Sequence, residues 1–192
     1  MSYSIVYSSQ TGNTKQLAET LRETLPQEGC RYFGIPAEAA AEADTLYVGF
    51  WTDRGHADAD CNAFLKTLRG KKVFLFGTAG FGGSAEYFAK ILSAVQAELD
   101  PSNTVVGTYM CQGRMPGSVR ARFAAQLEQD PENANAKRML ENFDRALSHP
   151  DEADLAAAAF FSNGKLAGSR KEAESFGAYG STCFNNKNSA GA

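Results

Sequence analysis

The amino-acid sequence predicts a doubly wound α/β fold, in which a five-stranded parallel sheet carries helices on both faces and extra helices follow at the C-terminal end. Two features predict it. Short apolar runs alternate along the chain with segments whose apolar residues recur at helical spacing. Most of these short runs also lack the polar alternation of a half-exposed strand, so we expect them to be buried on both faces, as in a parallel sheet.

The elements of this sheet can be placed in order along the chain. The predicted strands are residues 4–8, 31–34, 45–50, 72–77 and 104–110. Three helices between them are predicted by apolar stripes, which consist of Leu17, Leu21 and Leu25, of Cys61, Phe64, Leu65 and Leu68, and of Phe88, Ile91, Leu92, Val95 and Leu99. Right-handed crossovers would distribute these helices over both faces of the sheet.

The chain after residue 110 departs from this alternation. Residues 111–117 have the composition of a loop, and helices are predicted over 118–129, 134–147 and 151–161. Pro131 and Pro150 separate these helices, because the residue before a proline disfavours the helical conformation. We therefore assign residues 1–163 to one domain, and residues 164–192, rich in Gly, Ser, Ala and Asn, to a tail that does not fold alone.

The segment between the first predicted strand and the first helix indicates a phosphate site. It reads Ser9-Gln10-Thr11-Gly12-Asn13-Thr14. Backbone N–H groups at a helix start have no partner within the helix and lie at the positive end of its dipole, so they attract anions. The hydroxyls of Ser9, Thr11 and Thr14 can donate to phosphate oxygens, and Gly12 permits close approach of the backbone. The alternative is an ordinary turn whose Ser and Thr residues cap the helix.

The kind of phosphate ligand follows from what this loop lacks. No Lys or Arg precedes Lys15, and neither the nucleoside-triphosphate loop pattern nor G-x-G-x-x-G is present. A phosphate held by neutral donors suggests a cofactor with a single phosphate group.

Two further loops, residues 50–56 and 77–83, are expected to meet the phosphate loop, because ligands of open parallel sheets bind beyond the carboxyl ends of the strands. Each loop carries a large aromatic side chain, Trp51 or Phe81, on which a flat ligand can stack. Polar and backbone groups beside such a ring are expected from Thr52, Asp53 and Gly55 and from Thr78, Ala79, Gly80 and Gly82. Either aromatic residue alone could simply pack on the next helix. Three converging loops favour a ligand with a phosphate and a flat ring, and FMN fits this description.

With these residues the chain resembles the flavodoxin family. The phosphate loop fits the flavodoxin pattern [ST]-x-T-G-x-T, and residues 71–82 resemble the fourth strand and flavin loop of short-chain flavodoxins, in which an aromatic residue often occupies the position of Phe81. The resemblance covers about residues 1–110. It implies a flavodoxin-like fold, FMN as the cofactor and redox proteins as partners.

Two features depart from common flavodoxins. The loop at residues 51–56 carries Arg54 in place of the usual acidic composition, and the chain has the 111–117 loop with its extra helices. The second feature is similar to a divergent flavodoxin-like group of anaerobic bacteria, which is associated with electron supply to bilirubin reductase. Arg54 and Arg114, if near the flavin, would oppose the lowering of its potential by apolar stacking. Otherwise they are exposed or pair with a partner's acidic surface.

The resemblance implies an FMN-binding carrier that shuttles low-potential electrons between a reductase and an acceptor enzyme. A first alternative is an enzyme on the same fold, an FMN-dependent NAD(P)H, quinone or protoporphyrinogen oxidoreductase, for which the extra helices would wall off a substrate pocket. Against it, no second nucleotide-binding motif appears. A second alternative is a flavin-free interaction module, because a fold alone does not fix a function. The sequence leaves the question of stand-alone enzyme activity open.

Composition and single residues exclude other classes. The net charge of −3 predicts no nucleic-acid binding, and no apolar run has membrane-spanning length. The first residues have no basic region and no apolar run of signal-peptide length, so we expect no signal peptide. The cysteines form no C-x-x-C pair, and a reducing, cytoplasmic location is therefore expected. No catalytic residues and no metal site are predicted. We expect His56 to lie in a loop, His149 in a turn, Cys111 to be a buried inert thiol, and Cys183 to be the thiol most open to oxidation. The sequence does not predict the oligomeric state.

Overall fold

The computed structural model describes residues 2–82 and 84–163, so the tail predicted for residues 164–192, with Cys183, lies outside the described residues. The main sheet has the strand order β2-β1-β3-β5-β6, and every neighbouring pair is parallel. Its strands are β1 (Tyr3–Tyr7), β2 (Cys30–Gly34), β3 (Thr45–Asp53), β5 (Lys72–Ala79) and β6 (Thr104–Gln112). The parallel sheet and all five predicted strands are confirmed.

A short sixth strand, β4 (His56–Ala57), adds to the five predicted strands and lies in the segment expected to be a loop at residues 50–56. Strand β3 continues to Asp53 and then turns back, and β4 pairs antiparallel with its end. The two residues of the turn, Arg54 and Gly55, have φ angles of 49° and 87°. Positive φ at both central residues is the geometry of the tight two-residue hairpin turn whose twist matches that of its strands.

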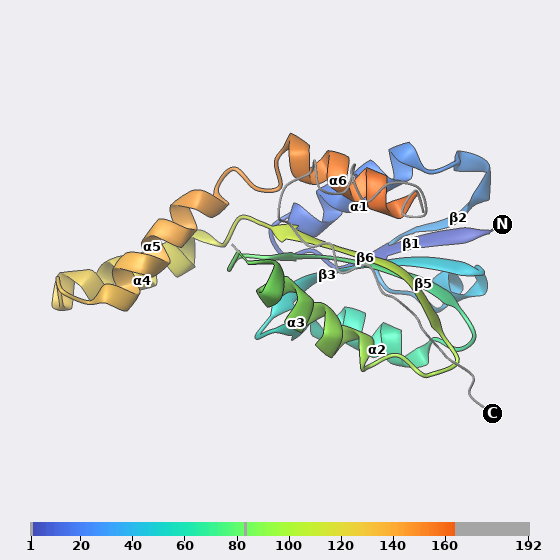
Figure 1. The fold of residues 1–192 in the computed structure, drawn as a ribbon, viewed down its shortest axis with the longest axis horizontal. Helices are drawn as coiled ribbons and strands as arrows, with labels where there is room; N and C mark the ends of the chain where they lie inside the picture. Colours follow the sequence, from blue (N-terminus) through green and yellow to red (C-terminus); the bar gives the residue numbers. More distant parts are fainter. Residues whose placement is uncertain (1, 83, 164–192) are drawn as a thin grey trace, which may run out of the picture.

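Helices cover both faces of the sheet (Figure 1). One face carries α1 (Asn13–Thr24) and α6 (Glu152–Ser162), and the other carries α2 (Ala59–Thr67) and α3 (Ala85–Gln96). The short 3-10 helices η1 (Gln27–Gly29) and η2 (Glu38–Glu42) lie in the connections on either side of β2. Successive residues of β5 alternate between the two cores: Val73 and Leu75 pack toward α2 and α3, and Phe74 and Phe76 toward α1 and α6. Burial on both faces therefore explains the apolar run of this strand.

The topology fixes where a ligand can bind. From β1 the chain crosses to β2 on one side, whereas β3, β5 and β6 follow on the other side. The strand order therefore reverses between β1 and β3, and beyond their carboxyl ends lies the crevice in which doubly wound proteins bind ligands.

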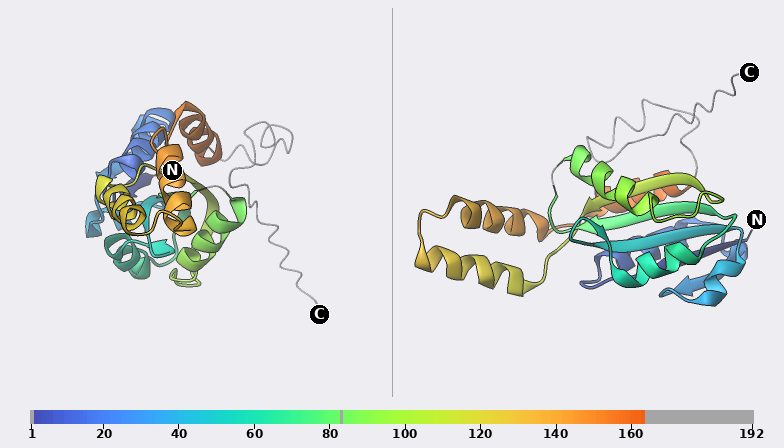
Figure 2. Two further views of the ribbon diagram at one scale, coloured as in Figure 1. Left: turned by 90° about the vertical axis from the view of Figure 1, so that its left-hand side faces the viewer. Right: turned by 90° about the horizontal axis from the view of Figure 1, so that it is seen from below.

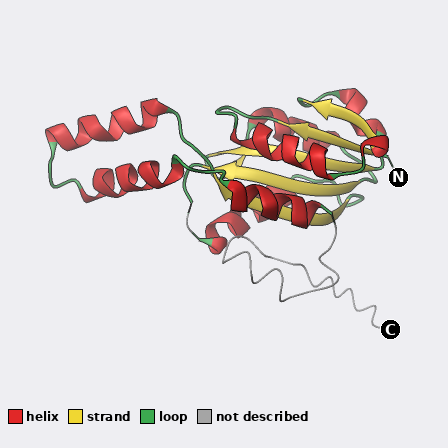
Figure 3. Cartoon of the chain, turned by 90° about the horizontal axis from the view of Figure 1, so that it is seen from above, coloured by secondary structure: helices red, strands yellow, loops and turns green. Residues whose placement is uncertain are grey.

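The extra helices form a hairpin that projects from this same edge of the sheet (Figures 1, 2 and 3). It consists of α4 (Gly117–Gln129) and α5 (Ala134–Ala146), and it is inserted between β6 and α6. The two helices share a small core formed by Phe123, Ala136 and Met139 together with Val119, Leu127 and Leu140. The three helices predicted after residue 117 are present, each within one residue of its predicted limits. Among the described residues, no helix combines the length and the apolar character needed to cross a membrane.

Candidate functional site

A cavity of about 570 Å³ lies at the carboxyl ends of the central strands, within the size range of small-molecule and cofactor sites. Its walls come from the phosphate loop, the β3–β4 turn, the loop after β5, α3 and the α4–α5 hairpin. It is lined by Gln10, Thr11, Asn13, Trp51, Thr52, Arg54, Gly55, Thr78, Ala79, Gly80, Phe81, Tyr87, Arg114, Met115, Pro116, Val119, Arg122 and Met139. In the described part of the chain, no Asp or Glu side chain lines it.

The N-terminus of α1 faces this cavity without a side-chain cap. Gly12 precedes the helix with a φ of 86°, a left-handed conformation that glycine adopts without steric cost, and its carbonyl accepts the first helical bond from Gln16 N at 3.0 Å. Within residues 2–82 and 84–163, no side chain accepts from the amides of the first turn, and the turn itself contains no acidic residue. The positive end of the helix is thus left for an anion.

The three hydroxyls of the phosphate loop differ in their partners. The Thr14 hydroxyl lies 3.0 Å from that of Thr78, and Thr11 Oγ1 donates to the carbonyl of Arg114 at 3.2 Å. Ser9 Oγ is buried and has no hydrogen-bond partner among the described residues. A buried hydroxyl without a partner is costly, so Ser9 is the side chain of this loop best suited to receive a ligand oxygen.

The end of β3 supplies the first aromatic wall. Trp51 is partly buried, and its carbonyl accepts from Asp58 N at 3.2 Å, which holds the β3–β4 hairpin closed. Thr52, beside it, lines the cavity, and its Oγ1 is buried with no partner in the described structure. The Trp51 ring can thus stack on a flat ligand in the cavity that Thr52 also lines.

The loop after β5 supplies the second wall. Phe81 is 40% exposed at the cavity, and its ring centroid lies 6.4 Å from that of Tyr87 in an edge-to-face arrangement. Burial raises the pKa of Tyr87, so its hydroxyl stays a neutral donor at physiological pH.

The α4–α5 hairpin and the segment before it are hydrogen-bonded to two of the three ligand loops, the phosphate loop and the loop after β5. The carbonyl of Arg114 accepts from Asn13 Nδ2 at 2.8 Å, which ties the base of the hairpin to the phosphate loop. The carbonyl of Gly80 accepts from Asn142 Nδ2 at 3.0 Å and from Gln112 Nε2 at 3.2 Å, which ties α5 and β6 to the loop after β5. The wall formed by the hairpin therefore has a fixed position relative to the cofactor loops.

The structure brings most of the predicted cofactor residues to one place. Those that line the cavity are Gln10, Thr11, Asn13, Trp51, Thr52, Gly55, Thr78, Ala79, Gly80 and Phe81. The others do not line it: Ser9 is half-buried, Gly12 is exposed, Thr14 is buried, Asp53 is exposed opposite His56 in β4, and Gly82 packs on Gln112. Sequence reasoning missed the wall formed by Tyr87, Met115, Pro116, Val119, Arg122 and Met139. No local pattern marks those residues, because their role depends on where the hairpin is anchored.

The histidine and the cysteines that were not predicted to bind the cofactor lie outside the cavity lining or are buried. Asp58 caps α2 by accepting from Cys61 N at 3.3 Å, and Cys61 and Cys111 are fully buried. Burial raises the pKa of both thiols above the ordinary range, so neither is a reactive thiolate. His56 is exposed in β4 and does not line the cavity.

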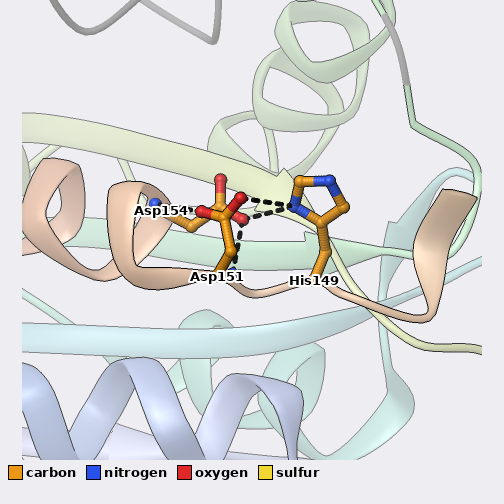
Figure 4. Close-up of side chains that lie close together, drawn as sticks. All are labelled: His149, Asp151 and Asp154. Atoms are coloured by element: carbon orange, nitrogen blue, oxygen red, sulfur yellow. Dashed lines mark hydrogen bonds and ion pairs between the residues drawn. The ribbon is translucent and has the colours of Figure 1, made fainter.

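The prediction that His149 is only a turn residue needs correction. Its Nδ1 lies 2.6 Å from Asp154 Oδ2, and Asp151 lies beside this pair (Figure 4). The two carboxylates form the capping box of α6, in which the Asp154 side chain accepts from Asp151 N and the Asp151 side chain accepts from Asp154 N. Helix capping thus accounts for the cluster, and none of its residues lines the cavity.

Fold and site together define a nucleotide-binding protein of the doubly wound α/β class, in which an uncapped helix N-terminus and two aromatic loops share one cavity. The chain belongs to the flavodoxin family, because the family described as "Flavodoxin domain" matches residues 4–163. Membership in this family supports FMN as the cofactor, and the unpaired hydroxyls and uncapped helix of the site fit that group.

Two curated relatives and one solved structure illustrate the similarity. The flavodoxin-like domain-containing protein BilS of Clostridium symbiosum is 45% identical over 175 residues, which cover 82% of this chain and 92% of that protein. Flavodoxin 1 of Escherichia coli K12 is 29% identical over 119 residues, covering 57% of this chain and 68% of the relative. The structure of oxidised Flavodoxin 2 from Bacillus cereus has a TM-score of 0.45 at 19% identity, covering 76% of this chain and 97% of that one.

Proposed function

We propose that this protein holds FMN in the cavity and carries low-potential electrons between a reductase and an acceptor enzyme. One observation carries the proposal. The uncapped N-terminus of α1 begins with Asn13, which lines the same cavity as Trp51 and Phe81, and the buried Ser9 hydroxyl without a partner in the described structure directly precedes the lining residue Gln10. An anion site beside an aromatic slot is what a phosphorylated flat ring needs.

Each wall has a defined task in this proposal. The first turn of α1 and Ser9 hold the phosphate, Trp51 and Phe81 cover the ring, and Thr52 with the backbone of residues 78–80 offers hydrogen bonds to the ring edge. When bound, FMN supplies the capacity to accept and release electrons singly or in pairs. The protein's share is to bind the group, orient it and limit its exposure to water.

The acceptor we propose is an enzyme of the bilirubin reductase kind, as the resemblance to the group from anaerobes implies. A cytoplasmic location belongs to the same proposal, since the three cysteines of the described residues are free thiols. The relative named BilS supports membership in that group through 45% identity.

An anaerobic reductive titration of the purified protein, reconstituted with FMN, tests this function. The carrier proposal expects one FMN per chain and two separate spectral steps on reduction. A chain that takes up no FMN would contradict the proposal and support a flavin-free module. Adding purified bilirubin reductase to the reduced protein, with bilirubin present, then tests the acceptor.

One observation favours the enzyme alternative: Met115, Val119 and Met139 of the hairpin segment wall the cavity, as a substrate pocket would require. Rapid mixing of the FMN-loaded protein with NADH or NADPH, with no other protein present, distinguishes the two functions. Fast flavin reduction under these conditions would identify a stand-alone oxidoreductase. A slow reaction that speeds up only when a reductase is added would identify a carrier.

A further inference from the structure

The cavity has a positively charged rim in a chain whose net charge is −3. Three arginines from separate elements make up this rim: Arg54 from the β3–β4 turn, Arg114 from the segment after β6, and Arg122 from α4. All three side chains are exposed, and in the described residues no acidic side chain joins them in lining the cavity. Asp53, next to Arg54 in the chain, is exposed but lies outside the lining.

The charges of this rim are not neutralised by the hairpin. Its ion pairs involve other residues, since Arg120 Nε lies 3.6 Å from Asp144 and Lys137 Nζ lies 3.4 Å from Glu132. Arg122 instead lies over the ring of Phe123, 4.7 Å from its centroid. Within the described ranges, no ion pair is formed by Arg54, Arg114 or Arg122.

A phosphate bound at the phosphate loop would not neutralise all three arginines of the rim. The Arg114 side chain is the one beside the phosphate loop, with its Nε 3.5 Å from Asn13 Oδ1. Arg54 lies instead in the β3–β4 turn, three residues after Trp51 of β3, and Arg122 lies on α4 of the projecting hairpin. These two positive charges therefore flank the mouth of the ring slot rather than the anion site.

The same mouth exposes an aromatic ring. Phe81 is 40% exposed at the cavity, although it packs edge-on against Tyr87. Arginine and exposed aromatic side chains are the residue types that dominate the centres of protein interfaces, and arginine pairs with carboxylates through two parallel hydrogen bonds. The rim thus combines an apolar anchor with two carboxylate-binding groups.

We propose that Arg54, Arg122 and Phe81 form the docking surface for an acidic redox protein, which exchanges electrons with the flavin at this edge. The inference rests on the proposed function. The hairpin argues for a protein rather than a small anion, because it extends well beyond the cavity (Figures 1 and 2). Opposite charges on the two proteins would speed their encounter and orient the complex.

Two haem proteins of opposite surface charge test whether the docking surface prefers an acidic partner. The FMN-loaded protein is reduced with dithionite and mixed anaerobically with excess of either the soluble domain of cytochrome b5, whose haem edge is acidic, or cytochrome c, whose haem edge is basic. Each ferric haem takes one electron and becomes ferrous, so one fully reduced flavin reduces two haems. The docking surface predicts that the rate with cytochrome b5 is high at low ionic strength and falls as salt is added.

The double variant Arg54→Gln/Arg122→Gln tests whether these two arginines cause the preference for the acidic cytochrome b5. The readout is the ratio of the two rate constants for one and the same variant, because a change in flavin potential affects both acceptors and largely cancels. We expect the rate constant with cytochrome b5, divided by that with cytochrome c, to fall roughly tenfold at low salt. The salt dependence of this ratio should flatten. Arg120→Gln, on the same helix but paired with Asp144 and outside the cavity, should leave the ratio unchanged.

Failure of this inference differs from failure of the proposed function. If the protein binds and reduces FMN but prefers cytochrome c at low salt, or if the double variant leaves the ratio unchanged, the acidic-partner proposal is overturned while the carrier function stands. If FMN is not bound, the proposed function itself fails. Circular dichroism of the variants, together with their FMN content, shows whether each protein is folded and loaded before rates are compared.

Discussion

Asn142 of α5 donates a hydrogen bond of 3.0 Å from its Nδ2 to the main-chain oxygen of Gly80, in the loop that follows β5. The Asn142 side chain is buried, and its Oδ1 accepts from Gln112 Nε2 at 3.2 Å. Gln112 also donates to the Gly80 carbonyl. The inserted hairpin and the cofactor loop therefore share one buried amide network, and the shape of the cavity depends on it.

Replacing Asn142 by Ala removes both of its contacts and leaves the Gly80 carbonyl with one donor. Loss of a partner from a buried polar group costs about 1–3 kcal/mol. We expect FMN affinity to fall by roughly 5- to 150-fold, because the loop carrying Phe81 loses its anchor. Fluorescence titration of the apoprotein with FMN measures this change.

Asn135→Ala is the matched control for that variant. Asn135 lies on the same helix and is exposed, and its side chain accepts from Arg138, a neighbour on that helix. It should bind FMN like the unmodified protein. Equal affinities for Asn142→Ala and Asn135→Ala would show that the amide network does not position the loop.

Gly80→Ala tests how closely the hairpin base approaches the same loop. A Cβ at residue 80 would lie 2.2 Å from Met115 Cγ, so the variant must displace Met115 or the loop. Overpacking of this kind costs about 1–3 kcal/mol in the free energy of unfolding. Urea denaturation should show that Met115→Ala in the same chain recovers part of that loss.

Gly117→Ala, at the first residue of α4, supplies the comparison. A Cβ there meets nothing within 4 Å, so this variant should be neutral or slightly stabilising. Should Gly80→Ala prove as harmless as Gly117→Ala, the close packing between Met115 and the loop would be refuted.

The parts of the structure that the sequence predicted are those that local patterns encode. The apolar runs predicted the parallel strands, the apolar stripes predicted α1, α2 and α3, and the prolines separated the helices after residue 117, whose limits were predicted to within a residue. The β3–β4 turn was missed because it lacks the usual Asn-Gly or Asp-Gly signal and uses Arg54 at positive φ, which is uncommon for residues other than glycine. The extra helices were expected to wall off a pocket under the enzyme alternative, but the residues of that wall were missed because contacts such as Asn142 to Gly80 join residues far apart in the sequence.

The buried thiols should resist modification in the folded protein. Cys61 and Cys111 are fully buried, and burial raises their pKa, so thiolate stays scarce at both positions at pH 8 to 9. An aromatic disulfide reagent should label the partly exposed Cys30 but neither of the other two, in a Cys183→Ser background. Adding urea should expose both.

The same shifts give the sign of a pH effect on stability. A thiol whose pKa is raised by folding favours the folded state below the unfolded pKa, about 8.5, and this advantage is lost as the pH rises toward the folded value. The free energy of unfolding should therefore decline at alkaline pH, and less steeply in Cys61→Ala and Cys111→Ala variants. Rapid labelling of either thiol in the folded protein would contradict their burial.

Ser9→Ala separates the demands of folding from those of the cofactor. Ser9 Oγ is buried without a partner in the described structure, so removing it relieves an unpaired polar group, and the apoprotein should be as stable as before or slightly more stable. A hydrogen bond to a charged phosphate is worth about 1.5–3 kcal/mol, so FMN affinity should fall roughly 10- to 150-fold. Riboflavin, which lacks the phosphate, should lose almost nothing. Calorimetric titration with both flavins measures the difference, and the exposed Ser118→Ala serves as control. A destabilised apoprotein with unchanged FMN affinity would assign the Ser9 hydroxyl to the fold instead of the phosphate.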